Sequence, residues 1–374
     1  ALSLVGSEMC IRDRPYRDAG IGLIGGTQEF STGGLGYTSL RGRLTELVQG
    51  QVIYLLRRLI RLLRIAKRYD LVVVIGDVIP VMAAWLSRRP VATYLVAYSS
   101  HYEGRLRLPW PCSDCLRSPR FKAIFSRDQL SADDLSIQLQ RHVNFLGNPF
   151  MDPVLSDAQR LPPAHRRLGL LPGSRRPELE QNLLLLLRVI DQLPEAWRDN
   201  GELQLELALV SSLQDVELSA LVAQGQWHLE AESDNKPSAL RRGGCRIWIR
   251  RGNFGAVLHS SDLLLCMAGT AAEQAVGLAR PVLQLVGQGP QFTEGFAEAQ
   301  RRLLGPTVFC APGEAGDPVT LARTAQMVLD LVERIHQDAD LKSVCDREAV
   351  NRLGPAGGGG RMAASISRLL TLPR

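Results

Sequence analysis

Short apolar runs alternate along the chain with longer segments in which apolar residues recur every three or four positions. The runs predict buried strands, and the periodic segments predict helices that cover them. Strands are predicted over residues 70–76, 91–97, 121–125, 143–146, 167–171, 202–210, 227–230, 245–250, 262–266 and 281–286, and helices over 45–69, 178–193, 214–223, 319–336 and 361–370. This alternation indicates an α/β fold with two doubly wound halves.

The helix predicted over Thr45–Tyr69 is strongly basic. Steps of 100° per residue place Arg57, Arg61, Arg64 and Arg68 on one stripe, opposite a leucine-rich face. The pattern fits a helix that rests on an anionic bilayer, and it also fits a helix of an α/β layer with a solvated face. The pattern alone favours the second interpretation.

Composition shifts divide the chain. Residues 1–14 lack an initiator Met and resemble a translated adapter read, so we expect them to be non-native. Residues 15–155 predict an incomplete N-terminal domain, a proline-rich polar stretch predicts a linker over 156–166, and 167–353 predict a C-terminal domain. The remaining 354–374 contain a C-terminal helix that we expect to pack back on the first domain.

The stretch Arg167–Glu178 predicts a strand, a tight turn and the start of a helix. Such a turn offers unpaired amides and the positive end of a helix dipole to an anion. Gly173 would let a ligand approach the backbone, and Arg175 could bind two phosphate oxygens at once. The stretch therefore predicts a diphosphate site, although an ordinary corner with a solvated arginine has the same pattern.

A second corner follows the strand Asp262–Cys266. Small residues from Met267 to Ala272 permit a close turn into another helix start, which again suits an anion or a sugar. Glu273 could accept hydrogen bonds from a ribose diol. The alternative is an acidic residue that simply stabilises the start of its helix.

Two further candidates lie in the N-terminal half. Asp77 follows the clearest strand, at the end where ligands collect in open α/β sheets. It could serve as a general base, but its spacing also suits a helix N-cap, which is the commoner role. His101 lies in a loop after the strand at 91–97 and is a candidate on the acceptor side, with surface packing as the alternative.

The amino-acid composition limits the kinds of binding partner and site that the protein can have. The chain has 374 residues, 45% of them hydrophobic, and a net charge of +6 that favours anionic partners such as nucleotides or acidic lipids. The seven cysteines indicate a reducing cytosol rather than a disulfide framework. Cys112 and Cys115 lack a second ligand pair, and Asp338 and Asp340 do not follow a strand, so we expect no metal. No apolar run is long enough to span a membrane.

Three motifs together carry a resemblance to a known family. They are Leu-Pro-Gly-Ser-Arg-x-x-Glu at 171–178, Gly-Asn-Pro at 147–149 followed by Asp152, and Gly-Thr-Ala-Ala-Glu at 269–273. In this order they resemble lipid-A-disaccharide synthase, and in particular a divergent branch of related bacterial proteins. The resemblance implies a GT-B fold, with two Rossmann-like domains facing across a cleft and the N-terminal one truncated.

The same resemblance implies a metal-independent, inverting glycosyltransferase without a cofactor. Asp77 would be the catalytic base, and Asn148, which stands where the synthase has His, would lie on the acceptor side with His101. The UDP-sugar would be bound by Gly173, Ser174, Arg175, Glu178, Gly269, Thr270, Ala271, Glu273 and Gln291.

The implied partners are a UDP-sugar, a lipid acceptor and an anionic membrane surface, with no nucleic acid. The protein would be cytoplasmic and peripheral on the cytoplasmic face of the inner membrane. Two alternatives stay open: a UDP-sugar 2-epimerase, and a non-catalytic UDP-sugar-binding protein on the same scaffold. Because the first strand and its glycine-rich loop are expected to be missing, the chain as given could also be an inactive fragment.

Overall fold

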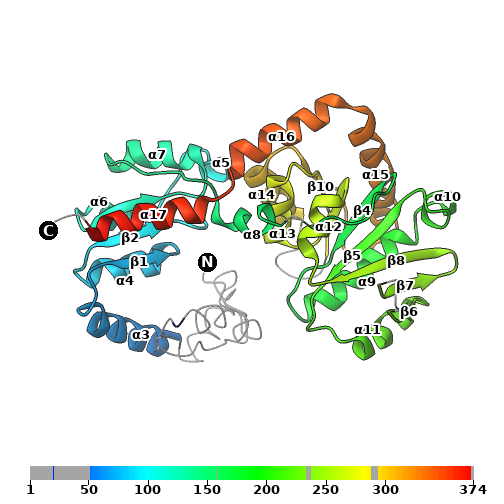
Figure 1. Ribbon diagram of the computed structural model, residues 1–374, viewed down its shortest axis with the longest axis horizontal. Coiled ribbons are helices and arrows are strands. Elements are labelled where there is room, and N and C mark those ends of the chain that lie inside the picture. Colours follow the sequence, from blue (N-terminus) through cyan, green and yellow to red (C-terminus); the bar gives the residue numbers. More distant parts are fainter. Residues whose placement is uncertain (1–19, 21–50, 158, 233–236, 288–293, 372–374) are drawn as a thin grey trace. The chain divides into compact units, whose positions relative to one another are not determined.

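The chain forms two compact units. A computed structural model describes residues 20, 51–157, 159–232, 237–287 and 294–371, so the predicted non-native segment 1–14 lies outside the described residues (Figure 1). Unit 1 takes the chain up to Arg127 with Ser131–Phe145 and Ala363–Arg374, and unit 2 takes Asp128–Leu130 and Leu146–Met362. The linker expected at 156–166 therefore falls within unit 2.

Unit 1 is built on a parallel sheet of three strands in the order β1-β2-β3, within the described residues. Its strands are β1 (Val72–Ile75), β2 (Val91–Tyr94) and β3 (Phe121–Phe125). Its helices are α3 (Gln51–Ala66), α4 (Val78–Leu86), α5 (Ser100–Glu103), α6 (Cys112–Arg117) and α7 (Gln129–Leu139). Apolar side chains from the strands and from α4, α6 and α7 form one buried core.

The expectation that both faces of β1 are covered is wrong. Val74 is buried, but Val73 and Ile75 on the other face are 49% and 71% exposed. The physical reason is position, because β1 is an edge strand in the part of unit 1 that the structure describes. An unbroken β-branched run predicts a strand but does not tell an edge strand from a central one.

Helix α3 lies within the predicted basic helix and packs against α4. Ala66 is buried, as expected for the inner face. The outer face is mixed rather than purely basic. It exposes the arginines 57, 61 and 64 together with Ile53, Leu56 and Ile60, which are 57%, 52% and 48% exposed.

Unit 2 is built on a sheet that has eight strands in the described part of the chain, in the order β11-β10-β9-β4-β5-β8-β7-β6. The strands from β11 to β8 pair in parallel, whereas β8-β7 and β7-β6 are antiparallel. The strands are β4 (Arg167–Leu171), β5 (Gln204–Leu209), β6 (His228–Glu230), β7 (Ala239–Arg242), β8 (Cys245–Arg251), β9 (Leu263–Cys266), β10 (Val282–Gln284) and β11 (Val308–Cys310).

Helices cover both faces of this sheet (Figure 1). They are α8 (Asp152–Leu155), α9 (Glu178–Ile190), α10 (Glu195–Arg198), α11 (Asp215–Val222), α12 (Phe254–Ser260), α13 (Gly269–Gly277), α14 (Glu294–Leu304), α15 (Pro318–Gln337) and α16 (Ala339–Leu353), with 3-10 turns at Pro149–Met151 and Ala223–Gly225. Helix α17 (Gly358–Thr371) begins in unit 2, and its residues from Ala363 belong to unit 1. Strand β9 shows why both faces must be covered. Leu263 and Leu265 join the core under α9 and α15, whereas Leu264 and Cys266 join the core under α12 and α13.

Strands β7 and β11 and helix α16 were not predicted, and neither were the short helices α5, α6, α8 and α10. Strand β7 pairs with β8 through a turn at Gly243 and Gly244, and Gly243 has φ +58°. A Gly-Gly dipeptide between two short strands is a hairpin signal, so this element could have been found. Asp338 is the N-cap of helix α16, and its carboxylate accepts hydrogen bonds from the Asp340 and Leu341 amides. That aspartate is therefore a helix cap.

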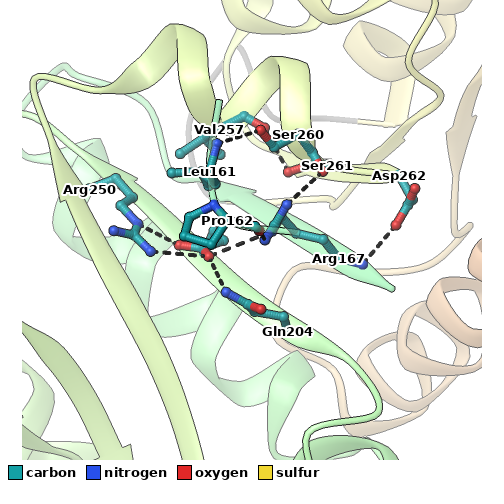
Figure 2. Close-up of polar contacts among 10 residues, drawn as sticks. Leu161, Pro162, Arg167, Gln204, Arg250, Val257, Ser260, Ser261 and Asp262 are labelled. Atoms are coloured by element: carbon teal, nitrogen blue, oxygen red, sulfur yellow. Dashed lines mark hydrogen bonds and ion pairs between the residues drawn. The ribbon is translucent and has the colours of Figure 1, made fainter. Parts of the chain in front are cut away.

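A buried ion cluster ties β4, β5 and β8 together (Figure 2). The fully buried Glu206 accepts from Arg250 Nε at 2.7 Å and from Gln204 Nε2 at 2.7 Å, and Arg167 Nε lies 3.6 Å from its carboxylate. Burial lowers the pKa of Arg167, and the nearby acids Glu206 and Asp262 oppose this effect.

The same cluster fixes the segment that was expected to be a linker. The guanidinium of Arg167 donates to the carbonyl oxygens of Pro162 and of Ser260, the latter at 3.2 Å. The Leu161 amide also donates to Ser260 Oγ at 2.9 Å, as Figure 2 shows. This proline-rich stretch is thus anchored within unit 2 by Arg167, which is near in sequence, and by Ser260, which is distant.

Candidate functional site

The two predicted corners lie next to each other in unit 2, at the carboxyl ends of neighbouring strands. Strands β4 and β9 pair in parallel with Leu171 opposite Cys266, and the Met267 amide donates to the Leu171 carbonyl at 2.8 Å. From these ends the chain enters α9 and α13 respectively. One edge of the sheet therefore carries two helix starts, each suited to an anionic group.

Gly173 joins the two corners. It has φ +97°, and a Cβ atom there would lie 3.3 Å from the Met267 carbonyl oxygen and 3.7 Å from Ala268 Cβ. A side chain would be strained at this φ and would crowd the second corner. The buried Asn182 of α9 holds the turn, because its Nδ2 donates to the Pro172 carbonyl at 2.9 Å.

The residues after Gly173 differ in their surroundings. Ser174 is exposed, while Arg175 and Glu178 are half-buried. The Arg175 carbonyl accepts from the Leu179 amide at 2.7 Å, which begins α9. The next residue, Arg176, makes ion pairs with Glu180 and, at 3.0 Å, with Glu217. The Arg176 side chain is therefore held by carboxylates of α9 and α11.

At the second corner, Glu273 is 9% exposed in α13, and its Oε1 accepts from Asn148 Nδ2 at 2.7 Å. Asn148 is fully buried, its Oδ1 accepts from the Phe150 amide at 3.0 Å, and its own amide donates to the Leu353 carbonyl. The carboxylate is therefore held in one orientation. Gly269 and Ala271 are half-buried and Thr270 is exposed, whereas Gln291 lies outside the described residues.

Asp77 lies in unit 1, directly after β1. It stands at the N-cap position of α4, but its side chain makes no capping hydrogen bond, so the cap interpretation is wrong. Its carboxylate instead accepts from the Val96 amide at 3.0 Å and from the Ala97 amide at 3.2 and 3.1 Å. Burial raises the pKa of Asp77, and these amides and Arg127 oppose the rise.

The two residues expected on the acceptor side belong to different units. Asn148 belongs to unit 2 and binds Glu273, whereas His101 belongs to unit 1. His101 is half-buried in the single turn of α5, and its amide donates to Ser99 Oγ at 3.2 Å.

Asp152 has a specific structural role that its motif alone does not indicate. Its carboxylate accepts from the amides of Gly357, Gly358 and Gly359 at 2.9, 3.1 and 2.7 Å. It therefore supplies the acceptors for the first turn of α17, and a Cβ atom at Gly359 would lie 2.8 Å from Asp152 Oδ2. This contact could not be predicted from a local sequence pattern, because the partners are about two hundred positions apart.

Neither a metal centre nor a bilayer-crossing helix is found in the described part of the chain. No group of three or more His, Cys, Asp or Glu side chains there could hold a metal ion. No described helix combines the length and apolar character that a bilayer crossing needs. Burial raises the pKa of the Cys112 and Cys245 thiols to about 12, so both stay protonated at neutral pH.

Two Rossmann-like units, one with a parallel sheet and one with a mostly parallel sheet covered on both faces, define the GT-B class of folds. The predicted α/β fold is thereby confirmed. The chain matches no protein-family profile and no curated protein.

Solved structures of this class resemble the chain along most of its length. The glycosyltransferase of kitacinnamycin is 16% identical, with 97% of this chain and 90% of that chain covered and a TM-score of 0.55. The UDP-GlcNAc 2-epimerase of Neisseria meningitidis, bound to UDP-GlcNAc, is 15% identical over 98% and 90%, with a TM-score of 0.51. The UDP-GlcNAc 2-epimerase of Methanocaldococcus jannaschii is 14% identical over 97% and 89%, with a TM-score of 0.50.

Proposed function

We propose that the protein is a GT-B enzyme that binds a UDP-sugar at the paired corners of unit 2. The observation that carries the proposal is the junction of β4 and β9, where two helix starts meet with Gly173 packed between them. Such an arrangement offers several backbone amides to one diphosphate. The names of the similar structures, which include an epimerase bound to UDP-GlcNAc, support a donor of this kind.

The diphosphate, the ribose and the sugar of the donor would be bound by different residues of the site. The diphosphate would contact the amides of Gly173 and Ser174 and the guanidinium of Arg175, while the Gly269–Ala271 turn would approach the phosphate from the other corner. Glu273 would accept hydrogen bonds from the ribose diol, in the orientation that Asn148 holds. Glu178, an acceptor in the first turn of α9, would bind a sugar or ribose hydroxyl rather than phosphate.

For the reaction we propose inverting, metal-independent transfer to a lipid acceptor, as in lipid-A-disaccharide synthase. Asp77 takes the proton from an acceptor hydroxyl while the hydroxyl oxygen bonds to the anomeric carbon, and the bond from that carbon to the phosphate oxygen breaks. Arg175 and the helix amides stabilise the negative charge on the departing UDP. A buried carboxylate with a raised pKa suits this base, because a stronger base accepts the proton more readily.

A lipid acceptor would require contact with a membrane surface, and we propose α3 for that contact. Its outer face exposes Ile53, Leu56 and Ile60 among arginines, the combination that suits the interface of an anionic bilayer. Vesicles of phosphatidylcholine with increasing phosphatidylglycerol test this role by co-sedimentation. Binding should rise with the anionic fraction and fall for Arg57→Gln with Arg61→Gln, and binding that ignores lipid charge would contradict it.

The alternative activity is UDP-sugar 2-epimerisation, which the similarity to two epimerase structures favours. The two activities differ in their need for an acceptor. Incubation with a panel of UDP-sugars, with and without a bacterial lipid extract, distinguishes them. A glycosylated lipid in mass spectrometry supports transfer, a new UDP-sugar epimer without lipid supports epimerisation, and binding with neither product supports a non-catalytic protein.

The donor site is tested by UDP titration in a calorimeter. Arg175→Ala should weaken UDP binding by roughly 10- to 100-fold, since a hydrogen bond to a charged group contributes about 1.5–3 kcal/mol. Arg176→Ala is the matched control, because this neighbour is held by Glu180 and Glu217 and should leave the affinity unchanged. Equal effects of the two substitutions would rule out the diphosphate assignment.

A further inference from the structure

One peptide group at the end of β2 lies between a cation and a carboxylate. The Val96 carbonyl accepts from Arg127 Nη1 at 3.1 Å. The amide of the same peptide group, that of Ala97, donates to both carboxylate oxygens of Asp77 at 3.2 and 3.1 Å. The Arg127 guanidinium is therefore connected to Asp77 through a single amide.

The sheet brings these three residues together. Asp77 follows β1, Val96 and Ala97 follow β2, and Arg127 follows β3, and the three strands are parallel neighbours in unit 1. Their carboxyl ends consequently meet at one edge. Asp77 and Arg127 are only 7% and 6% exposed, so water screens little of the interaction between them.

A hydrogen bond to a carbonyl polarises its peptide group and strengthens the bond that the amide on the other side donates. A cation on the carbonyl thus makes the amide a better donor to a carboxylate. It also fixes the peptide plane, and with it the direction of the donor that holds Asp77.

We propose that Arg127 is a positioning residue that acts through the Val96–Ala97 peptide group to keep Asp77 ionised and correctly oriented. Its importance for catalysis rests on the proposed function, in which Asp77 is the base. The linkage from Arg127 through this peptide group to Asp77 lies within unit 1, so it can be measured without an enzyme assay.

Few other titratable groups act on Asp77 from the described elements packed around it. From α6 the Cys112 thiol faces it, but burial raises the pKa of that thiol to about 12, so it is neutral in the working range. From the end of β3, Arg127 is the charged group that opposes the effect of burial on the pKa of Asp77. Removing Arg127 should therefore move the titration of Asp77 in one direction only, toward higher pH.

The test is a ¹³C NMR titration of the carboxyl groups in the full chain, with the Asp77 signal assigned by its loss in Asp77→Asn. Arg127→Gln should raise the midpoint by about 0.5–1 pH unit, less than the 1–3 that a cation in direct contact produces. Arg127→Lys should restore most of the wild-type midpoint. Arg120→Gln is the matched control, because Arg120 also donates to a backbone carbonyl, that of Trp85, and should leave the midpoint unchanged.

An unchanged midpoint in Arg127→Gln, or an equal shift in Arg120→Gln, would overturn the proposal. If Arg127→Gln does not fold, the linkage between Arg127 and Asp77 is tested in the wild-type protein instead. The ¹⁵N shift of the Ala97 amide and that of Arg127 Nε should then both follow pH with the Asp77 midpoint, and a flat Arg127 Nε signal would refute the linkage.

An activity assay distinguishes a failure of this inference from a failure of the proposed function. If the chain transfers sugar, the acidic limb of its kcat/KM profile should move with the NMR midpoint in Arg127→Gln and return in Arg127→Lys. If Asp77→Asn retains transfer, the assignment of the base fails, whereas the NMR linkage between Arg127 and Asp77 still stands or falls by itself.

Discussion

The substitution Glu206→Gln offers a direct test of how the buried ion cluster supports unit 2. Glu206 is fully buried, and the side chains of Arg167 and Arg250 are 4% and 14% exposed. Glutamine keeps the shape of the side chain but removes the negative charge, so two buried arginines lose their counter-ion. Breaking a buried pair in this way costs about 3–5 kcal/mol, because it leaves an uncompensated charge in a medium of low polarity.

The exposed Glu298 provides a matched comparison. It also pairs with two arginines, Arg301 and Arg302, at 2.7 and 3.0 Å, which is no longer than the 2.7 and 3.6 Å of the Glu206 pairs. Those arginines are 52% and 60% exposed, so solvent replaces much of what the pairs contribute. Glu298→Gln should therefore change stability little, and burial rather than distance would explain the contrast.

Thermal unfolding followed by circular dichroism measures both variants. At roughly 2–4 °C per kcal/mol for a unit of this size, Glu206→Gln should lower the midpoint by about 6–20 °C. Adding Arg250→Met should recover part of the loss, because one unpaired charge is removed with it. Equal midpoints for Glu206→Gln and Glu298→Gln would refute the reasoning.

Three further outcomes follow from the structure. Gly173→Ala should cost about 1–2 kcal/mol at φ +97° and weaken UDP binding at least tenfold, and a calorimetric affinity equal to wild type would contradict the role of this turn. Asp77→Asn should abolish transfer and yet be at least as stable at pH 7. Because burial raises the pKa of Asp77, the wild type loses stability as pH rises through that pKa; the difference between the two melting temperatures should thus disappear below about pH 4, and a constant difference would contradict it. Asp152→Ala should cost about 0.5–2 kcal/mol and speed amide exchange at Gly358 and Gly359, whereas unchanged exchange there would exclude the capping role.

Local patterns predicted most of the strands and the larger helices. The leucine run of β9 predicted a strand, and its successive residues enter opposite cores. The apolar run of β1 led to the wrong prediction that both of its faces are covered. An apolar run does not show where a strand lies in its sheet, and β1 is an edge strand among the described residues. Missed elements such as β7 and β11 are only four and three residues long, which is too short for a periodic signal.

The candidate site was predictable in its parts but not in its assembly. Both corners were expected from Gly173 and from the small residues around Gly269, yet their contact depends on the pairing of β4 with β9. The bond between Asn148 and Glu273 joins positions that no local pattern relates. The same holds for Arg127 and Asp77, which become linked only when three strands align.

The large sheet of unit 2 ends in two short strands. In the described part of the chain its outermost members, β6 and β11, are three residues each, and Glu230 at the end of β6 is paired with Arg241 and Arg246. A free border of this length exposes few main-chain groups to a second molecule, and charged side chains discourage its approach. The sheet can therefore hold long, aggregation-prone apolar strands at its centre while presenting poor templates for polymerisation at both margins.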